Sequence, residues 1–362
     1  MTKERINALR SILRDKKLDA FLISHPENRR YLSGFTGSAG FLFISFDKAI
    51  LATDFRYTEQ ANRQSPDFEI LQITGAMTSW LPETLKTLNC KNIGFEAEDL
   101  TVSAHERLLE TVRGADNVEV DFTPTQGFVE PLRSLKEESE VNDLQAAIDA
   151  SDAAMNAITA ILKPGMTEKE VGWKLEQAMR DFGAEGPSFE TIVASGPNAA
   201  LPHHRPSDRD LRIGEPIVID MGALVNGYCS DLTRTVILGD PDKKFTEIYD
   251  IVHTAQLAAI NTVVEDMTGG EVDALSRNII EEAGYGDQFG HSLGHGVGLA
   301  VHEAPRVGKG VEDHIKNGMV FTIEPGIYIS GWGGVRIEDI VILEEGNARV
   351  LSHANKRETL GV

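Results

Sequence analysis

The chain lacks the features that mark secreted and membrane proteins. It has only two cysteines in 362 residues, Cys90 and Cys229, which cannot form a disulfide framework and are typical of a reducing compartment. The longest apolar stretch, residues 39–52, is interrupted by Asp47 and Lys48, so no membrane span is expected. The N-terminal segment is charged throughout and does not resemble a signal peptide. We therefore expect a cytoplasmic protein that does not contact a membrane.

Basic residues are also scarce. The chain has 35 lysines and arginines against 56 acidic residues, which gives a formal net charge of −21. A nucleic-acid partner would need a basic face for its phosphates, so we expect none. A phosphate-binding loop is absent too, because Lys309 is followed by Gly310 and position 303 is a glutamate. The apolar fraction of 41% is that of a globular chain, and the length allows two domains.

The first third of the chain alternates helical and strand patterns. Helices are expected near residues 3–13, 56–64, 78–88 and 101–113, and strands near residues 19–24, 41–46, 49–53, 68–73 and 92–95. This alternation predicts a small α/β domain with helices packed on a sheet. Pro124, Gly127 and Pro131 then mark a boundary. We assign residues 1–128 to this domain, 129–137 to a linker and 138–362 to a second domain.

The second domain repeats one scheme twice. A helix, a second helix and a β-hairpin are expected from residue 138 and again from residue 245, with a break at Gly269-Gly270 before the last helix. Thr167 and Glu170 form a capping box, in which a hydroxyl and a carboxylate bind free amides at the start of a helix. The pattern predicts an α+β domain whose two similar halves, related by a pseudo-twofold axis, face a shared cleft.

Four carboxylates occupy matching places in the two halves. Asp220 and Glu324 each lie in a glycine-bounded apolar run, and Asp231 and Glu338 follow them after a turn. Because the segments read as antiparallel partners, we expect the two acids of each hairpin to lie roughly opposite each other. Either acid of the apolar runs could alone be an edge charge, but their matched positions disfavour that interpretation. Four acids in an apolar cleft would repel one another unless cations were present.

A histidine completes a metal-ligand set. His295 lies between Gly294 and Gly296, and these small residues allow the backbone and a ligand to approach closely. Four carboxylates and one imidazole suit manganese(II), with cobalt(II) or zinc(II) as alternatives. Five ligands are too many for one small site and suit two divalent ions that share carboxylates and a hydroxide.

These residues resemble the pita-bread metallopeptidases. The five ligands, together with His203 in residues 198–203 and with the sequence His302-Glu303-Ala304-Pro305, are most similar to Xaa-Pro aminopeptidases (aminopeptidase P) and Xaa-Pro dipeptidases (prolidases). Residues 32–40 and 54–57 are similar to the N-terminal domain of that family, so the resemblance covers nearly the whole chain. It implies an exopeptidase that hydrolyses the Xaa-Pro bond of proline-containing peptides or dipeptides.

The resemblance also implies a role for each ligand. Asp220 would bind the first metal, His295 the second, and Asp231 with Glu338 would bridge both. Glu324 would bind the second metal, contact the bridging hydroxide and act as general base and later as general acid. The metals would stabilise the oxyanion that develops when the hydroxide attacks the carbonyl before proline.

Substrate contacts are implied for the histidines near this set. His203 and His302 would hydrogen-bond the carbonyl or the tetrahedral intermediate, and one of them would pass a proton to the leaving nitrogen. His291 would face the same pocket if its segment is helical. As alternatives, His302 or His291 could be an ordinary half-buried structural histidine.

Two arginines are further candidates. Arg306 stands where prolidases of this family place an arginine for the C-terminal carboxylate of the substrate, although a surface ion pair is an equal alternative. Arg336 lies two residues before Glu338, and we expect it on the same strand face, where it would orient the carboxylates from outside the ligand set.

Other activities remain open on the same fold. Methionine removal would usually accompany a shorter N-terminal extension, metal-free creatine hydrolysis would not need five ligands, and a silent binding module would have lost some of them. The resemblance further implies a homodimer in which the N-terminal domain shades the mouth of the site, with Phe35, Arg56 and Tyr57 as candidates. The choice between dipeptidase and aminopeptidase stays open.

Overall fold

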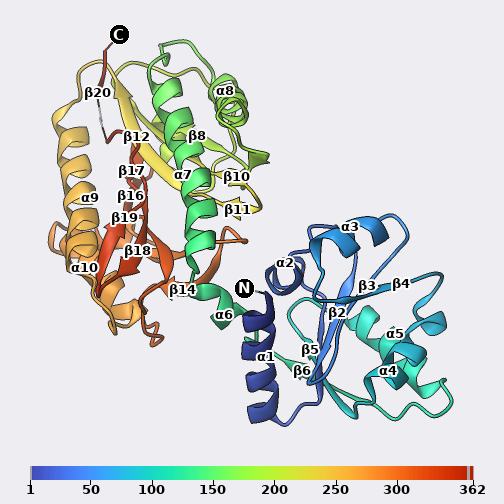
Figure 1. The fold of residues 1–362 in the computed structure, drawn as a ribbon. Helices are drawn as coiled ribbons and strands as arrows, with labels where there is room; N and C mark the ends of the chain where they lie inside the picture. Colours follow the sequence, from blue (N-terminus) through green and yellow to red (C-terminus); the bar gives the residue numbers. More distant parts are fainter. Residues whose placement is uncertain (1, 357–358, 362) are drawn as a thin grey trace. The chain divides into compact units, whose positions relative to one another are not determined.

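The protein forms two compact units in the computed structural model, which describes residues 2–356 and 359–361 (Figure 1). The boundary between the units falls between Arg133 and Ser134. Part of the segment assigned above to a linker is helical, since α6 spans Glu130–Ser134. No helix within the described residues is both long enough and apolar enough to cross a membrane.

The first unit is built on a six-stranded sheet with the order β4-β3-β2-β1-β5-β6. β1 pairs antiparallel with β2 and parallel with β5, so the sheet is mixed. The strands are β1 (Ala20–Ile23), β2 (Phe41–Ser45), β3 (Ala49–Thr53), β4 (Glu69–Gln72), β5 (Asn92–Glu96) and β6 (Asp121–Thr125). The strands predicted near residues 41–46 and 49–53 are confirmed as β2 and β3, which pair antiparallel as a hairpin around Asp47 and Lys48.

Helices of the first unit pack on this sheet through their apolar faces. They are α1 (Thr2–Lys16), α2 (Pro26–Ser33), α3 (Thr58–Gln64), the short 3-10 helix η1 (Met77–Ser79), α4 (Leu81–Leu88) and α5 (Val102–Arg113). Leu85 of α4 and Leu108 of α5 are buried in one cluster with Phe43 and Ile93 of the strands. The α/β character of this unit is therefore as predicted.

Two elements of this unit were not predicted. α2 begins with Pro26, which suits the first helical position because proline lacks the amide that would stay unpaired there. Glu96 accepts the amides of Ser24 and His25 at 2.7 and 2.6 Å, just before this helix. β6 contains Pro124 and is an edge strand, the place in a sheet where a missing amide is tolerated.

The three N-terminal candidates for the mouth of the site differ in exposure. Phe35 is buried in the first unit and packs edge-on against Tyr57, with 5.9 Å between ring centroids. The ring is 1% exposed, so within this unit it offers almost no surface to a substrate, and its expected shading role stays a prediction. Arg56 is exposed and pairs with Asp54 at 2.7 Å.

The second unit confirms the predicted repeat of two helices and a sheet. The first half contains α7 (Glu138–Thr159), α8 (Glu168–Asp181), β7 (Gly186–Pro187), β8 (Ile192–Ser195), the 3-10 helix η2 (Gly196–Ala200), β9 (Pro216–Met221), β10 (Ala223–Val225), β11 (Tyr228–Cys229) and β12 (Leu232–Leu238). The strands β20-β12-β9-β8 form a sheet in that order, with β20 (Thr359–Leu360) at its edge.

The second half follows the same order. It contains α9 (Lys243–Thr262), α10 (Gly269–Glu282), the 3-10 helix η3 (Gly286–Gln288), β13 (Gly294–Gly296), β14 (Glu303–Val307), β15 (Val320–Ile323), β16 (Gly326–Ile329), β17 (Gly333–Arg336), β18 (Asp339–Glu344) and β19 (Asn347–Val350). Its main sheet has the order β14-β13-β15-β18-β19. The long helices α7 and α9 flank the strands of this unit (Figure 1). Each half has its own buried apolar cluster.

Both second helices of the repeat begin with a capping box. The predicted box at Thr167 is confirmed: its hydroxyl accepts the amide of Glu170 at 3.1 Å, and the Glu170 carboxylate accepts the amide of Thr167 at 2.9 Å. Thr268 and Glu271 make the same pair of bonds at 3.1 and 2.7 Å. The helix therefore starts at Gly269. The break between α9 and α10 lies at residues 263–268, just before the Gly269-Gly270 pair at which it was predicted.

Gly269 is needed in the first turn of α10 for a packing reason. A Cβ atom at this position would lie 2.3 Å from the carbonyl oxygen of Arg306 in β14. The close approach of helix and strand therefore requires glycine here, although glycine is a poor helix former.

Candidate metal centre

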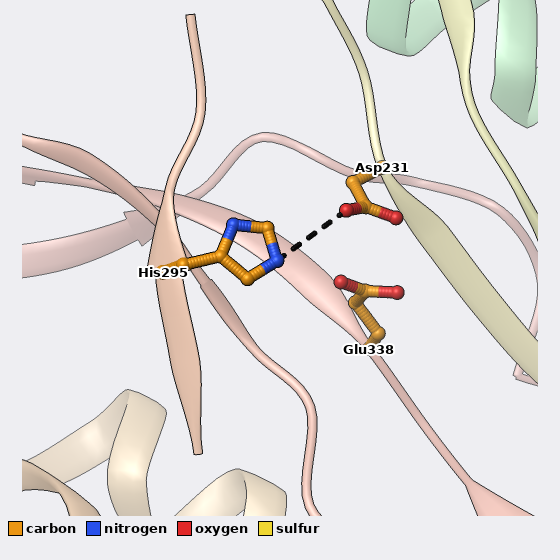
Figure 2. Close-up of side chains that lie close together, drawn as sticks. All are labelled: Asp231, His295 and Glu338. Carbon is orange, nitrogen blue, oxygen red and sulfur yellow. Dashed lines mark ion pairs between the residues drawn. The ribbon is translucent and has the colours of Figure 1, made fainter. Parts of the chain in front are cut away.

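Four of the five predicted ligands converge on one buried point. Asp231, His295 and Glu338 each offer an atom within 4.8 Å of the others. Figure 2 shows the imidazole of His295 pointing toward both carboxylates. Nε2 of His295 lies 3.6 Å from a carboxylate oxygen of Asp231 and 3.3 Å from Oε1 of Glu324.

The fifth predicted ligand, Asp220, is held at the edge of this group by Arg336. The guanidinium Nη2 donates to Oδ2 of Asp220 at 2.6 Å, and both side chains are nearly inaccessible. The charge of Asp220 contributes to the raised pKa values of both Asp231 and Glu338, so it belongs to the same electrostatic cluster. Arg336 was expected to orient carboxylates of the ligand set. It does contact one of them, and that one is Asp220.

The register of the first hairpin differs from the prediction by two residues. Asn226 and Gly227 form a two-residue turn with positive φ values of 48° and 72°, which places Val225 opposite Tyr228. Continued along the strands, this register sets Asp220 opposite Thr233. The prediction that Asp220 and Asp231 lie opposite each other is therefore wrong. The residue opposite Asp220 is Thr233, and Asp231 lies just before the start of β12.

The second hairpin brings its acids together at the strand ends. Ile323, the last residue of β15, pairs with Asp339, the first residue of β18. Glu324 and Glu338 are the next residues outward on the two strands, so they continue the same register by one step. The expected opposition of these two acids agrees with this geometry.

Burial sets the protonation of Asp231 and Glu338. Removal from water, with neighbouring carboxylates adding to it, raises the pKa values of Asp231 and Glu338 well above their ordinary values. For Glu324 burial acts in the same direction, but the hydrogen bond from His295 and its charge outweigh it and leave the pKa lowered. Burial alone would lower the pKa of His295, but its hydrogen bond with Glu324 and the charge of that carboxylate raise it.

Two buried oxygens make the cluster fit a cation. Oδ1 of Asp220 and Oε1 of Glu338 have no hydrogen-bond partner within the described residues. A buried polar atom without a partner costs free energy, and the cost is larger for a charged group. Divalent ions would satisfy both oxygens, and a set of carboxylates with one imidazole suits hard or borderline metals.

The glycines beside His295 allow the close packing that the sequence predicted. A Cβ atom at Gly294 would lie 2.0 Å from the carbonyl oxygen of Thr322, and one at Gly296 would lie 2.1 Å from that of Ala304. Nδ1 of His295 lies 3.1 Å from the carbonyl oxygen of Gly296. Donation of the Nδ1 proton to this carbonyl would free Nε2 to bind a metal ion, the tautomer that a metal ligand needs.

A hydrogen-bonded chain behind the cluster was largely missed from the sequence. The Thr233 hydroxyl donates to Oε2 of Glu338 at 2.7 Å and accepts from Nε of Arg336 at 3.0 Å. Nη1 of Arg336 donates to the hydroxyl of Tyr328 at 2.8 Å. Burial raises the pKa of Tyr328 to about 12, so this hydroxyl keeps its proton.

His291 belongs to this chain and does not lie on a helix. The segment before β13 is irregular, so the helical condition in the prediction is wrong. Nδ1 lies 2.8 Å from the carbonyl oxygen of Ser292, and Nε2 lies 3.0 Å from the hydroxyl of Tyr328. Burial lowers the pKa of His291, which favours a neutral ring that donates from Nδ1 and accepts from Tyr328 at Nε2.

The remaining candidates lie on the exposed side of the cluster. The rings of His302 and His295 are 4.2 Å apart between centroids. Burial, followed by the charges of His295 and the exposed His203, lowers the pKa of His302. Arg306 is exposed on β14 at the position paired with His295 of β13.

A buried ion pair fixes the segment that carries His302. Nζ of Lys136 lies 2.6 Å from Oε1 of Glu303, and both side chains are almost fully buried. The Lys136 amide also donates to the carbonyl oxygen of Gly318 at 2.8 Å. Neither partner was singled out as an ion pair from the sequence, since they are far apart along the chain.

Replacing Lys136 by methionine should therefore destabilise the protein strongly. The change leaves Glu303 as a buried charge without its cation, and we expect a loss of about 3–5 kcal/mol in the free energy of unfolding. Urea unfolding followed by circular dichroism measures it. Lys169→Met is the matched control, because the Lys169–Asp208 pair is exposed and should contribute less than about 1 kcal/mol. Equal losses in the two variants would contradict this role for Lys136.

Comparison with known proteins finds a matching family for each of the two units. Residues 142–345, more than half of the chain, match the family described as metallopeptidase family M24, and residues 5–135 match the creatinase/prolidase N-terminal domain. The chain is 38% identical over 355 residues to an Xaa-Pro dipeptidase of Pyrococcus furiosus, covering 98% of this chain and 99% of the relative.

Two solved structures are similar over nearly their whole length. One is an Xaa-Pro dipeptidase from Bacillus anthracis, with a TM-score of 0.95, 42% identity and full coverage of both chains. The other is an X-Pro aminopeptidase from Thermotoga maritima, with a TM-score of 0.89, 38% identity and 99% coverage of both chains.

The two-unit fold and the buried carboxylate–histidine cluster define a metallopeptidase with a creatinase-type N-terminal domain and a pita-bread C-terminal domain. The chain belongs to metallopeptidase family M24, in the branch that contains the prolidases and aminopeptidase P. The similar structures carry both activity names, so they do not choose between a dipeptidase and an aminopeptidase.

Proposed function

We propose that this protein is a dinuclear metal-dependent exopeptidase that hydrolyses the Xaa-Pro bond at the N-terminus of peptides or in Xaa-Pro dipeptides. The observation that carries the proposal is the buried convergence of Asp231, His295 and Glu338, with unpartnered oxygens on Asp220 and Glu338. The names of the similar proteins, Xaa-Pro dipeptidase and X-Pro aminopeptidase, supply the substrate class.

The ligand set would hold two divalent ions, most simply manganese(II). The residues that would bind them are Asp220, Asp231, His295, Glu324 and Glu338. When bound, such ions supply Lewis acidity and lower the pKa of coordinated water toward neutrality.

The chain itself would move the proton. The pKa of Glu324 is lowered, so its carboxylate is ionised at neutral pH and can accept a proton from the attacking water. The same group can then return that proton to the proline nitrogen that leaves. Arg336 keeps Asp220 in place from behind, and its own bonds to Thr233 and Tyr328 fix the guanidinium.

The exposed histidines would bind the scissile carbonyl. His302 lies against His295, and His203 is close enough to influence its charge. Because the pKa of His302 is lowered, its ring is neutral at pH 7 and can donate one N–H to the carbonyl oxygen as negative charge develops there. His291, whose two nitrogens are already bonded, would support Tyr328 and contact substrate only indirectly.

Arg306 gives a test of substrate length. If it binds the C-terminal carboxylate of a dipeptide, Arg306→Ala should lower kcat/KM for an Xaa-Pro dipeptide by roughly 10- to 100-fold, the effect of losing a hydrogen bond to a charged group. A tripeptide Xaa-Pro-Xaa has its carboxylate elsewhere and should lose less than about threefold. Steady-state kinetics on the manganese-loaded enzyme measures both.

The neighbouring exposed cation provides the control for this test. Lys309→Ala removes an exposed positive charge three residues away and should leave kcat/KM unchanged for both substrates. Equal loss on dipeptide and tripeptide in Arg306→Ala would make Arg306 a structural residue. Failure of the unmodified protein to cleave any Xaa-Pro substrate would overturn the proposed function itself.

A further inference from the structure

The loop that carries His203 is hydrogen-bonded to the buried carboxylate of Glu168, which takes no part in the proposed reaction. Glu168 is the first residue of α8, and its exposed fraction is 0%. Its two oxygens accept hydrogen bonds from two short stretches of chain, residues 195–198 and 204–207. A fully buried carboxylate is costly unless it is satisfied in this way, so the arrangement needs an explanation.

The bonds to Glu168 come from residues around the loop and not from its own helix. Oε1 accepts the amide and the hydroxyl of Ser195, both at 2.8 Å, and Nδ2 of Asn198 at 3.0 Å. Oε2 accepts the amide of Ser207 at 3.0 Å and its hydroxyl at 2.6 Å, and lies 2.9 Å from Nε2 of His204. Burial raises the pKa of Glu168, but these hydrogen bonds outweigh it and leave the pKa lowered.

These contacts lie on both sides of His203. Asn198 precedes it by five residues, His204 follows it directly, and Ser207 follows it by four. Within the described residues the imidazole of His203 has no hydrogen bond or ion pair of its own. Its position therefore depends on the backbone of residues 198–207, which we call the His203 loop.

A simple helix cap does not explain Glu168. α8 is already capped by Thr167 and Glu170, whose side chains satisfy the free amides at its start. Arg209 extends the network away from the helix, with Nη1 donating to the hydroxyl of Ser195 at 2.7 Å and Nη2 to Glu215 at 2.6 Å. The network therefore fixes the His203 loop against β8 and β9.

We propose that Glu168 is a positioning residue for the peptidase reaction, which holds the His203 loop so that His203 lies beside His302 at the metal cluster. The inference rests on the proposed function, since it assigns Glu168 an effect on turnover through His203. Glu168 itself does not touch substrate or metal in this account.

A double-mutant cycle tests this coupling. Glu168→Gln keeps the shape of the side chain but turns an amide N–H₂ toward groups that are themselves donors. We expect kcat for an Xaa-Pro dipeptide to fall roughly 10- to 100-fold with KM changed less than about threefold, as for a lost hydrogen bond to a charged group. In a His203→Ala background the same change should lower kcat by less than about twofold, because the group that Glu168 positions is gone.

Two further variants complete the design. Glu170→Gln alters an exposed carboxylate in the same turn of α8 without contacting the His203 loop, and should keep kcat within about twofold. Ser207→Ala removes one loop donor and leaves Glu168 in place. It should lower kcat in the unmodified enzyme and not in His203→Ala, and it carries the test if Glu168→Gln does not fold. Bound metal, measured by mass spectrometry, should be unchanged in every folded variant.

The outcomes separate this inference from the proposed function. If the effects of Glu168→Gln and His203→Ala multiply independently, or if Glu168→Gln keeps full kcat, Glu168 does not act through His203 and the inference is wrong. In that case the Xaa-Pro activity of the unmodified protein still supports the proposed function. An unmodified, metal-loaded protein without Xaa-Pro activity would overturn the function first and the inference with it.

Discussion

Glu324→Gln reduces kcat for an Xaa-Pro substrate by about 10²- to 10⁴-fold in this account, the usual contribution of a general acid–base residue. Glutamine keeps the size of the side chain but cannot accept the proton of the attacking water. The unmodified carboxylate lies inside the cluster, with Oε1 3.3 Å from Nε2 of His295, where it can reach that proton. Steady-state assays on metal-loaded protein measure the change in kcat.

The control for Glu324→Gln is an acid outside the cluster. Glu312→Gln changes an exposed carboxylate of the same unit and should leave kcat unaltered. Circular dichroism should show both variants folded. Within the described residues the Glu324 side chain accepts one hydrogen bond besides its contact with His295, from the Thr322 hydroxyl at 3.2 Å, and glutamine can still accept it. Near-native turnover in Glu324→Gln with both ions bound would remove the role that we assign to Glu324.

Removing divalent ions should abolish turnover and lower thermal stability together. The cluster holds several buried acids, and Asp220 and Glu338 each have an oxygen without a hydrogen-bond partner among the described residues. An ion present at 100 times its Kd stabilises the folded state by about 2.7 kcal/mol. For a unit of this size that corresponds to a rise in Tm of roughly 5–10 °C. Differential scanning calorimetry before and after chelation measures it.

Restoration is the control for metal removal. Adding manganese(II) to the chelated protein should recover both activity and Tm. In Asp231→Asn, which loses one carboxylate of the proposed ligand set, the recovery should be much weaker. Full activity in protein shown by elemental analysis to contain no transition metal would contradict the metal-dependent mechanism.

The acids of the site could be found from the sequence because they repeat. Asp220 and Glu324 stand in similar apolar runs, and such runs predict buried strands whatever the rest of the fold does. The position of Asp231 relative to Asp220 could not be fixed in the same way. It depends on which residues form the turn. Asn226 and Gly227 take left-handed conformations that centre the turn between them, whereas Asp220 opposite Asp231 would need a turn centred one residue earlier.

The residues that support the ligands had no comparable signal. Thr233, Tyr328 and Lys136 act through bonds to side chains that are distant along the chain, and a buried hydroxyl or ammonium has no characteristic spacing. Glu168 was hidden for a related reason. It stands inside a capping box, where an acid in the first helical turn has an ordinary local explanation.

Local signals also misled at two points of the fold. Gly269 and Gly270 predict a break, yet Thr268 caps a helix that begins with them. Pro124 was interpreted as part of a domain boundary, yet it lies in the edge strand β6. The homodimer, the cytoplasmic location and the choice of manganese remain predictions.

The dinuclear mechanism can be tested by titrating metal-free protein with manganese(II) while bound metal and Xaa-Pro hydrolysis are followed on the same samples. A dinuclear site predicts that activity reaches its maximum at two equivalents of tightly bound metal per chain. Maximal activity at one equivalent, or two bound equivalents without any cleavage of Xaa-Pro substrates, would contradict it.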